Sequence, residues 1–174
     1  MNTIKIGMIG FGTIGAGVAK ILTENSEIIQ KRLGARIELV KVADLDIVTD
    51  RGVKLAPDAL TTSAEEVINH PDITVLIELM GGYELARKFL LQAIEQGKHV
   101  VTANKALLAK HGDELFSAVA EKGLSIGYEA SIGGAIPIIR SVREAFVANN
   151  IQSMEGIVNG TANYILSKMS DENC

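Results

Sequence analysis

The sequence predicts an α/β fold built on a doubly wound parallel sheet, with helices on both of its faces. Short apolar runs alternate with longer segments whose apolar residues recur at helical spacing. The apolar runs are hydrophobic at nearly every position, which is typical of parallel strands covered on both faces. Because strand–helix–strand connections are right-handed, this alternation gives a doubly wound sheet.

The first half of the chain supplies three of the expected strands and two helices. The first helix begins after a glycine-rich turn, presents Ile14, Val18, Ile21 and Leu22 on one face, and ends at Gly34. Ser63-Ala64-Glu65-Glu66 has the spacing of a capping box and opens a short second helix. We therefore expect strands at 4–9, 37–43 and 73–79, and helices at 13–32 and 63–70.

The second half continues the alternation. Gly97 and Gly123 are expected to end two helices, and Pro137 is placed to begin a third. The strands expected here are 99–102 and 124–128, and the helices are 84–96, 112–122 and 137–149.

Composition excludes several classes of protein. The chain has 174 residues, 47% of them hydrophobic, and a net charge of −4, with no basic stripe of the kind that binds nucleic acid. Its apolar runs are short and interrupted, so no membrane span and no secretory signal are expected. The single cysteine, Cys174, fits a reducing compartment. We expect a cytoplasmic protein without nucleic-acid or membrane partners.

The most specific local pattern is Gly10-Phe11-Gly12-Thr13-Ile14-Gly15, directly after the first strand. Gly10 allows the tight turn, Gly12 lets a pyrophosphate approach the backbone, and Gly15 lets the helix pack close to the strand. The helix N-terminus then presents free N–H groups to the phosphates. This strand–turn–helix context predicts a Rossmann-type dinucleotide site.

In such sheets, ligands bind beyond the carboxyl ends of the strands. This rule brings together Gly10–Gly15, Asp44, Met80–Gly82, Ala103–Lys105 and Glu129–Ile136, and we call this edge of the sheet the rim.

Asp44, after the second strand, is expected to accept hydrogen bonds from a ribose and so to favour NAD over NADP. Asp46 is a competitor for this role, and Lys41 or Arg51 could still bind a 2′-phosphate.

Lysine at the rim can orient a carbonyl or donate a proton, which makes Lys105 a candidate, although a solvated helix start explains it as well. We expect structural roles for His99 and His111. The loop Glu129–Pro137 could hold a hard cation through its carbonyls and Glu129, yet its chemistry alone favours a tight loop. Asn159-Gly160-Thr161 is either a helix cap or a binding loop.

Four motifs occur together and in order: GFGTIG, Thr102–Lys105, Tyr128–Pro137 and Gly156–Ile165. Over essentially all 174 residues the chain resembles the amino-terminal part of a homoserine dehydrogenase. That resemblance implies NADH- or NADPH-dependent interconversion of aspartate semialdehyde and homoserine, on the branch to threonine, methionine and isoleucine. It also implies a homodimer in the full-length protein.

The resemblance also implies roles for individual residues. Lys105 would be catalytic and bind substrate with Gly160 and Thr161. A sodium-type cation would be held by Glu129 and the carbonyls of Ile132, Gly134 and Ile136. The cofactor-binding set would be Gly10, Phe11, Gly12, Thr13, Ile14, Gly15, Asp44, Met80, Gly81, Gly82, Asn104, Lys105 and Gly160.

This sequence departs from the family's pattern in two ways. Ala43-Asp44 stands just after the second strand, where many NADP-using members carry Arg, so NAD(H) is favoured and NADP(H) remains possible. The family's catalytic domain continues beyond Cys174, so residues 1–150 are expected to form the Rossmann domain and 151–174 the first strand and helix of a second, α+β substrate domain. A non-catalytic NAD(H)-binding module, or another dehydrogenase acting on an amino acid or a sugar, remains open.

Overall fold

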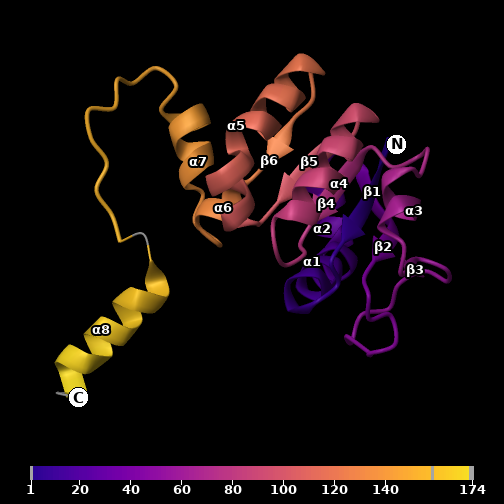
Figure 1. The fold of residues 1–174 in the computed structure, drawn as a ribbon, viewed down its shortest axis with the longest axis horizontal. Coiled ribbons are helices and arrows are strands. Elements are labelled where there is room, and N and C mark those ends of the chain that lie inside the picture. The colour runs from indigo at the N-terminus through magenta and orange to yellow at the C-terminus, as the bar shows by residue number, and fades with distance from the viewer. Residues whose placement is uncertain (1, 158, 173–174) are drawn as a thin grey trace.

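A six-stranded sheet with every neighbouring pair parallel forms the centre of the computed structural model, which describes residues 2–157 and 159–172 (Figure 1). The strand order is β3-β2-β1-β4-β5-β6, the order of a Rossmann sheet. The doubly wound fold is thereby confirmed. The strands are β1 (Thr3–Ile9), β2 (Arg36–Ala43), β3 (Leu60–Thr61), β4 (Val75–Glu78), β5 (His99–Thr102) and β6 (Ile126–Gly127).

Helices connect these strands. The described helices are α1 (Thr13–Glu24), α2 (Ser26–Leu33), α3 (Ala64–Ile68), α4 (Glu84–Glu95), α5 (Lys105–Glu121), α6 (Glu129–Ile132), α7 (Ile138–Arg140) and α8 (Gly160–Glu172), with a π-helical turn at Ser141–Ala145 after α7. None of them is long and apolar enough to cross a membrane.

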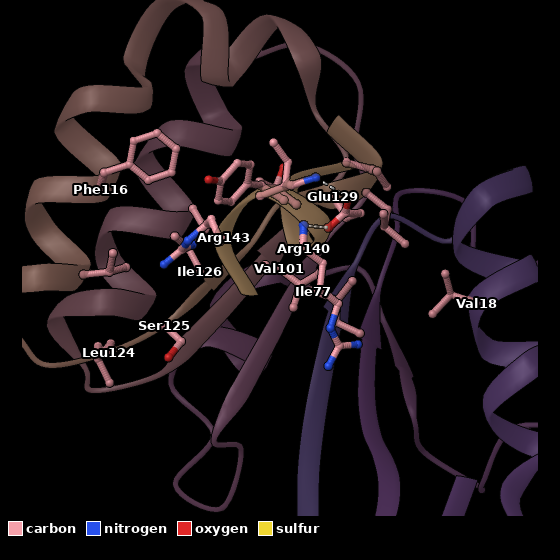
Figure 2. A pocket seen from close by; sticks show the side chains of 18 of the residues that line it. Val18, Ile77, Val101, Phe116, Leu124, Ser125, Ile126, Glu129, Arg140 and Arg143 are labelled. Carbon is pink, nitrogen blue, oxygen red and sulfur yellow. Dashed lines mark hydrogen bonds between the residues drawn. The ribbon is translucent and has the colours of Figure 1, made fainter. Parts of the chain in front are cut away.

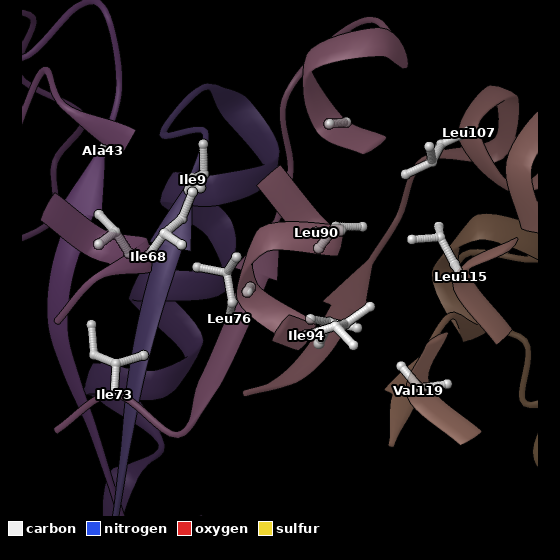
Figure 3. Packing of buried hydrophobic residues seen from close by; sticks show 14 residues of the cluster. Ile9, Ala43, Ile68, Ile73, Leu76, Leu90, Ile94, Leu107, Leu115 and Val119 are labelled. Carbon is white, nitrogen blue, oxygen red and sulfur yellow. The ribbon is translucent and has the colours of Figure 1, made fainter. Parts of the chain in front are cut away.

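Two apolar clusters hold the sheet between its helices. The larger joins α3, α4 and α5 to the sheet, and Figure 3 shows Leu90 and Ile94 of α4 between Leu76 of β4 and Leu115 of α5. The smaller comprises Met8, Phe11, Ala19 and Val42 and joins α1 to β1 and β2. Burial of this surface supplies most of the driving force for folding. The sheet is therefore a rigid support for the loops at the carboxyl ends of its strands.

The single helix expected at 13–32 is wrong, because the chain forms two helices that meet at Asn25. Its expected buried face is only partly right. Ile14 and Ile21 are 62% and 56% exposed, whereas Gly15 and Ala19 are buried. Small residues lie against the sheet because the helix packs too close to β1 for larger side chains. Gly34 ends α2 in the left-handed conformation, as expected.

Other boundaries also differ from expectation. Helix α5 begins at Lys105 rather than near Gly112, because Asn104 caps it and the helix continues through a kink at His111. The two-residue strand β3 and the four-residue helix α6 had no counterpart in the prediction. The expected strand at the start of the second domain is absent, since residues 151–157 form no regular element.

The carboxyl-terminal part carries no core. All described residues from Arg143 onward are exposed, and α8 lies apart from the sheet in Figure 1. Large apolar side chains are among them, including Val147, Met154, Tyr164 and Leu166. The boundary expected near residue 150 stays a prediction.

Candidate functional site: the glycine-rich turn and the rim

The three glycines of the first turn have the geometry that the motif predicts. Gly10 has a φ of +99°, and a Cβ there would lie 2.5 Å from the Leu79 carbonyl oxygen. A Cβ on Gly15 would collide with the Gly10 carbonyl oxygen. Around Gly12, by contrast, a Cβ would meet no protein atom within 4 Å. Gly10 and Gly15 are therefore required by the fold, whereas Gly12 keeps a space open for something else.

That space lies at the start of α1. Gly12 is the N-cap of the helix, and no side chain caps it. The first N–H groups of a helix have no partner within the helix, and they carry the positive end of the helix dipole. An open position without a Cβ beside uncapped N–H groups fits a phosphate.

Asp44 is tied to the same turn. One carboxylate oxygen accepts a hydrogen bond from the Phe11 N–H at 2.5 Å, and the other accepts from the Asp46 N–H at 2.9 Å. The turn is also joined to β2 by the Gly10 N–H, which donates to the Ala43 carbonyl at 2.8 Å. Each carboxylate oxygen retains a lone pair for a hydroxyl, so the placement is compatible with ribose binding.

The competing residues at this end of the rim have other partners. Asp46 accepts from the N–H groups of Val48 and Thr49 and pairs with Arg51 at 3.0 Å. Hydrogen bonding from Thr49 lowers the pKa of Asp46. Lys41 donates to the Asp58 carbonyl at 2.8 Å. Asp46 therefore organises its own loop, and both nearby cations are already engaged.

On the other side of β1, the structure joins Met80–Gly82 to the start of α5. The Asn104 side chain donates to the Gly82 carbonyl at 2.5 Å and accepts from the Leu107 N–H at 3.1 Å. Lys105, the first residue of α5, is exposed. A cation at a helix N-terminus opposes the helix dipole, so helix stability does not explain a lysine there.

Glu129 has a clear role of its own in the structure. Its carboxylate accepts from the N–H groups of Ile139 and Arg140 at 2.8 and 3.1 Å, which are drawn in Figure 2. The Ile136 carbonyl accepts from the Ile138 N–H at 2.9 Å. Glu129 and the Ile136 carbonyl therefore hold the start of α7, and a cation site at these residues stays a prediction. Within 2–157 and 159–172, no cluster of three His, Cys, Asp or Glu side chains could hold a metal.

A cavity of about 930 Å³ adjoins the rim between α1 and the last three strands. Figure 2 shows Glu129 and Arg140 between Val18 of α1 on one side and Phe116 and Leu124 on the other. Ile14 and Ala103 also line it, so the cavity reaches from the helix that follows the glycine-rich turn to the end of β5.

The two histidines lie away from the rim or serve the fold. His99 begins β5 at the opposite edge, where its ring nitrogen Nδ1 accepts from the Ser125 N–H at 3.0 Å. His111 lies inside α5, and the centre of its ring is 6.0 Å from that of the Tyr83 ring. The structural roles expected for both fit these contacts.

Gly160 and Thr161 do not lie at the rim. They begin α8, where the Asn159 side chain accepts from the Ala162 N–H at 2.9 Å. Asn159 is thus a helix cap, one of the two alternatives for this segment. A role in binding for Gly160 and Thr161 stays a prediction.

Sequence reasoning missed the buried polar residues beneath the rim. Thr102 and Ser131 are buried, and the Ser131 hydroxyl donates to the Thr102 carbonyl at 2.8 Å. Glu78 is fully buried next to Thr102. The available signal was a single glutamate that interrupts the apolar run 73–79.

Comparison with known proteins agrees with this geometry. The family model for the homoserine dehydrogenase NAD-binding domain matches residues 10–129, and the model for homoserine dehydrogenase matches 137–174. The homoserine dehydrogenase of Synechocystis sp. is 44% identical over 170 residues, which cover 98% of this chain and 39% of the relative.

Solved structures give the same result. The crystal structure of a homoserine dehydrogenase from Thiobacillus denitrificans is 42% identical with a TM-score of 0.93, and the match covers 100% of this chain and 40% of that one. A hyperthermophilic archaeal homoserine dehydrogenase in complex with NADPH is 26% identical with a TM-score of 0.79, over 97% of this chain and 57% of its own.

The chain therefore spans about 40% of the length of its bacterial relatives. Its first 129 residues carry the glycine-rich turn, the parallel sheet and the NAD-binding family model. Since that model covers more than half of it, the chain belongs to the homoserine dehydrogenase family.

Proposed function

We propose that this chain binds NAD(H) along the rim and serves hydride transfer between L-homoserine and L-aspartate 4-semialdehyde. The observation that carries the proposal is the open space beside Gly12 at the uncapped start of α1. The two neighbouring glycines are explained by clashes within the protein, whereas this one is explained by a bound pyrophosphate.

The cofactor would extend along the rim in the order of the strands. Asp44, after β2, would accept hydrogen bonds from the adenosine ribose, and Gly10–Gly15, after β1, would bind the pyrophosphate. Met80–Gly82 and Asn104, after β4 and β5, would then lie beside the nicotinamide half. When bound, the nicotinamide donates or accepts the hydride at the carbonyl carbon.

Lys105 would bind the substrate carbonyl and deliver the proton that the forming alkoxide needs. Its exposure, its place at the carboxyl edge of β5 and its unfavourable position in the helix dipole support this role. In the direction of aldehyde reduction, one hydride and one proton convert the aldehyde to the alcohol, and NADH becomes NAD+. Gly160 and Thr161 would join the substrate site only after α8 moves toward the rim.

NAD(H) is the proposed cofactor, with NADP(H) as the alternative. The carboxylate of Asp44 would repel a 2′-phosphate, and Arg51 and Lys41 are paired within the protein. NADPH is the cofactor bound in the archaeal relative, which leaves that alternative open.

The proposal includes a monovalent cation at Glu129 and the carbonyls of Ile132, Gly134 and Ile136, and a homodimeric whole protein. For the cation to bind, Glu129 would have to release the N–H groups of Ile139 and Arg140.

The test is steady-state oxidation of NADH with aspartate semialdehyde, on this chain and on a version extended through the downstream reading frame. We expect NADH binding by both and fast turnover only in the extended version, because Lys105 is exposed to solvent in this chain. Water exclusion and further positioned groups each contribute orders of magnitude to such rates.

Lys105→Met in the extended version should lower kcat by about 10²- to 10⁴-fold. Lys110→Met is the matched control, since Lys110 lies on the same helix and contacts the Tyr83 ring instead. An extended version that reduces another aldehyde but not aspartate semialdehyde would overturn the proposal.

A further inference from the structure

Glu78 is a buried charged side chain that the proposed chemistry does not use. It ends β4 and is fully buried, the only acidic residue of the described chain with no exposed surface. Taking a carboxylate out of water is costly unless hydrogen bonds replace the water. The partners of this carboxylate therefore indicate why it is there.

Those partners belong to two different parts of the rim. One carboxylate oxygen accepts from the Met80 N–H at 2.9 Å, and the other lies 2.6 Å from the Thr102 hydroxyl. The Thr102 hydroxyl oxygen in turn accepts from the Asn104 N–H at 3.0 Å. Glu78 thus connects the loop after β4 with the loop after β5.

Asn104 completes a ring of hydrogen bonds by donating from its side chain to the Gly82 carbonyl. The ring runs from the Glu78 carboxylate to the Met80 N–H and along the backbone to the Gly82 carbonyl. It continues through the Asn104 side chain to the Asn104 N–H, and through the Thr102 hydroxyl back to Glu78. Its members are the two loops proposed to surround the nicotinamide, and Lys105 follows Asn104 directly.

The fold itself does not require a carboxylate at this position. β4 and β5 are already aligned by four backbone pairs, and the apolar cluster that includes Leu76 packs α3, α4 and α5 against the sheet. Burial raises the pKa of the Glu78 carboxyl, and the hydrogen bonds from Thr102 and Met80 act against that rise. Replacing a buried hydrogen-bonded carboxylate together with its polar partners by apolar groups of similar shape is often neutral or stabilising, so packing alone does not account for this polar network.

We propose that Glu78 is a positioning residue that fixes the distance between the Met80–Gly82 loop and the Asn104–Lys105 helix start, and thereby shapes the nicotinamide half of the cofactor site. The inference rests on the proposed function. It predicts a selective effect, because Asp44 and the glycine-rich turn bind the other half and share none of these hydrogen bonds.

The experiment is calorimetric titration of the full 174-residue chain with NADH and, separately, with ADP. Glu78→Leu removes both hydrogen bonds, and we expect NADH affinity to fall at least tenfold while ADP affinity changes less than twofold. Glu78→Gln keeps an acceptor for the Met80 N–H and a polar contact to Thr102, so it should restore part of the NADH affinity. Thr102→Val, which breaks the ring elsewhere, should resemble Glu78→Leu.

Lys98→Met is the matched control. Lys98 is also buried and charged, but it lies at the opposite edge of the sheet and donates to the His70 and Ile73 carbonyls. It should lower the free energy of unfolding and leave both affinities unchanged.

The outcomes separate the two proposals. Absence of NADH binding by the unmodified chain would overturn the proposed function. NADH binding by Glu78→Leu and Thr102→Val that is as strong as in the unmodified chain, or a loss of ADP affinity in both variants as large as the loss of NADH affinity, would overturn the role of Glu78 alone.

Discussion

Gly12 is the residue at which a substitution is expected to block the proposed ligand without disturbing the fold. Since a Cβ there meets no protein atom within 4 Å, Gly12→Val should leave the fold intact and fill the space proposed for the pyrophosphate. We expect NADH binding to be abolished in a calorimetric titration, with an unchanged circular dichroism spectrum.

Gly17→Val is the control for this substitution, because Gly17 lies one turn further along α1 and is equally free of neighbours. It should bind NADH like the unmodified chain. Undiminished NADH affinity in a folded Gly12→Val variant would contradict the assignment of the turn.

Asp44 is the residue that we expect to determine whether the chain prefers NADH or NADPH. Asp44→Ala removes both an acceptor for the ribose hydroxyls and the charge that repels a 2′-phosphate. It should therefore weaken NADH binding and reduce the preference of the chain for NADH over NADPH. Asp44→Arg should reverse it. Parallel titrations with NADH and NADPH measure both effects.

Asp50→Ala, in the same loop, should change neither the NADH nor the NADPH affinity, since within the described residues the Asp50 side chain accepts from the Gly52 N–H alone. Tenfold tighter binding of NADPH than of NADH by the unmodified chain, a difference of about 1.4 kcal/mol, would contradict this role of Asp44.

Among the elements, the start of α5 combines a structural and a proposed binding role in one side chain. Asn104 caps the helix by accepting from the Leu107 N–H, and Ser63 caps α3 by accepting from the Glu66 N–H at 3.4 Å. Replacing either by Ala should cost about 1 kcal/mol of unfolding free energy in urea denaturation.

Only Asn104→Ala should also weaken NADH binding, because only Asn104 holds the Gly82 loop. Equal NADH affinities in Asn104→Ala and Ser63→Ala would show that the loop needs no support from Asn104.

The elements also show what the sequence could and could not predict. The strand His99–Thr102 was predicted with its observed bounds, because an apolar run lay between two clear boundaries. Helix α5 was predicted too short, since Gly112 resembled a helix start. Gly112 is in fact buried within the helix, where a Cβ would lie 3.4 Å from the Phe116 ring. The burial of Gly112 depends on the packing of α5 against other elements, which the local pattern does not show.

At the scale of the whole molecule, the rim could be predicted because parallel strands place all their carboxyl ends at one edge. Contacts between loops that are distant in sequence could not. Examples are the hydrogen bond from the Phe11 N–H to Asp44 and the engagement of Glu129 with α7. Each depends on side-chain directions that only the assembled sheet determines.

We propose above that NAD(H) binds at the carboxyl edge of this sheet. A ¹H–¹⁵N NMR titration of the chain with NADH tests this proposal most directly. Glycines lie at the carboxyl edge and at the opposite edge of the sheet, and their amide signals show at which edge NADH binds. We predict shifts of the amide signals of Gly12, Gly15, Gly81 and Gly82, with those of Gly34, Gly97 and Gly123 unmoved at the opposite edge. Shifts confined to the second group, or no shifts at millimolar NADH, would contradict the claim.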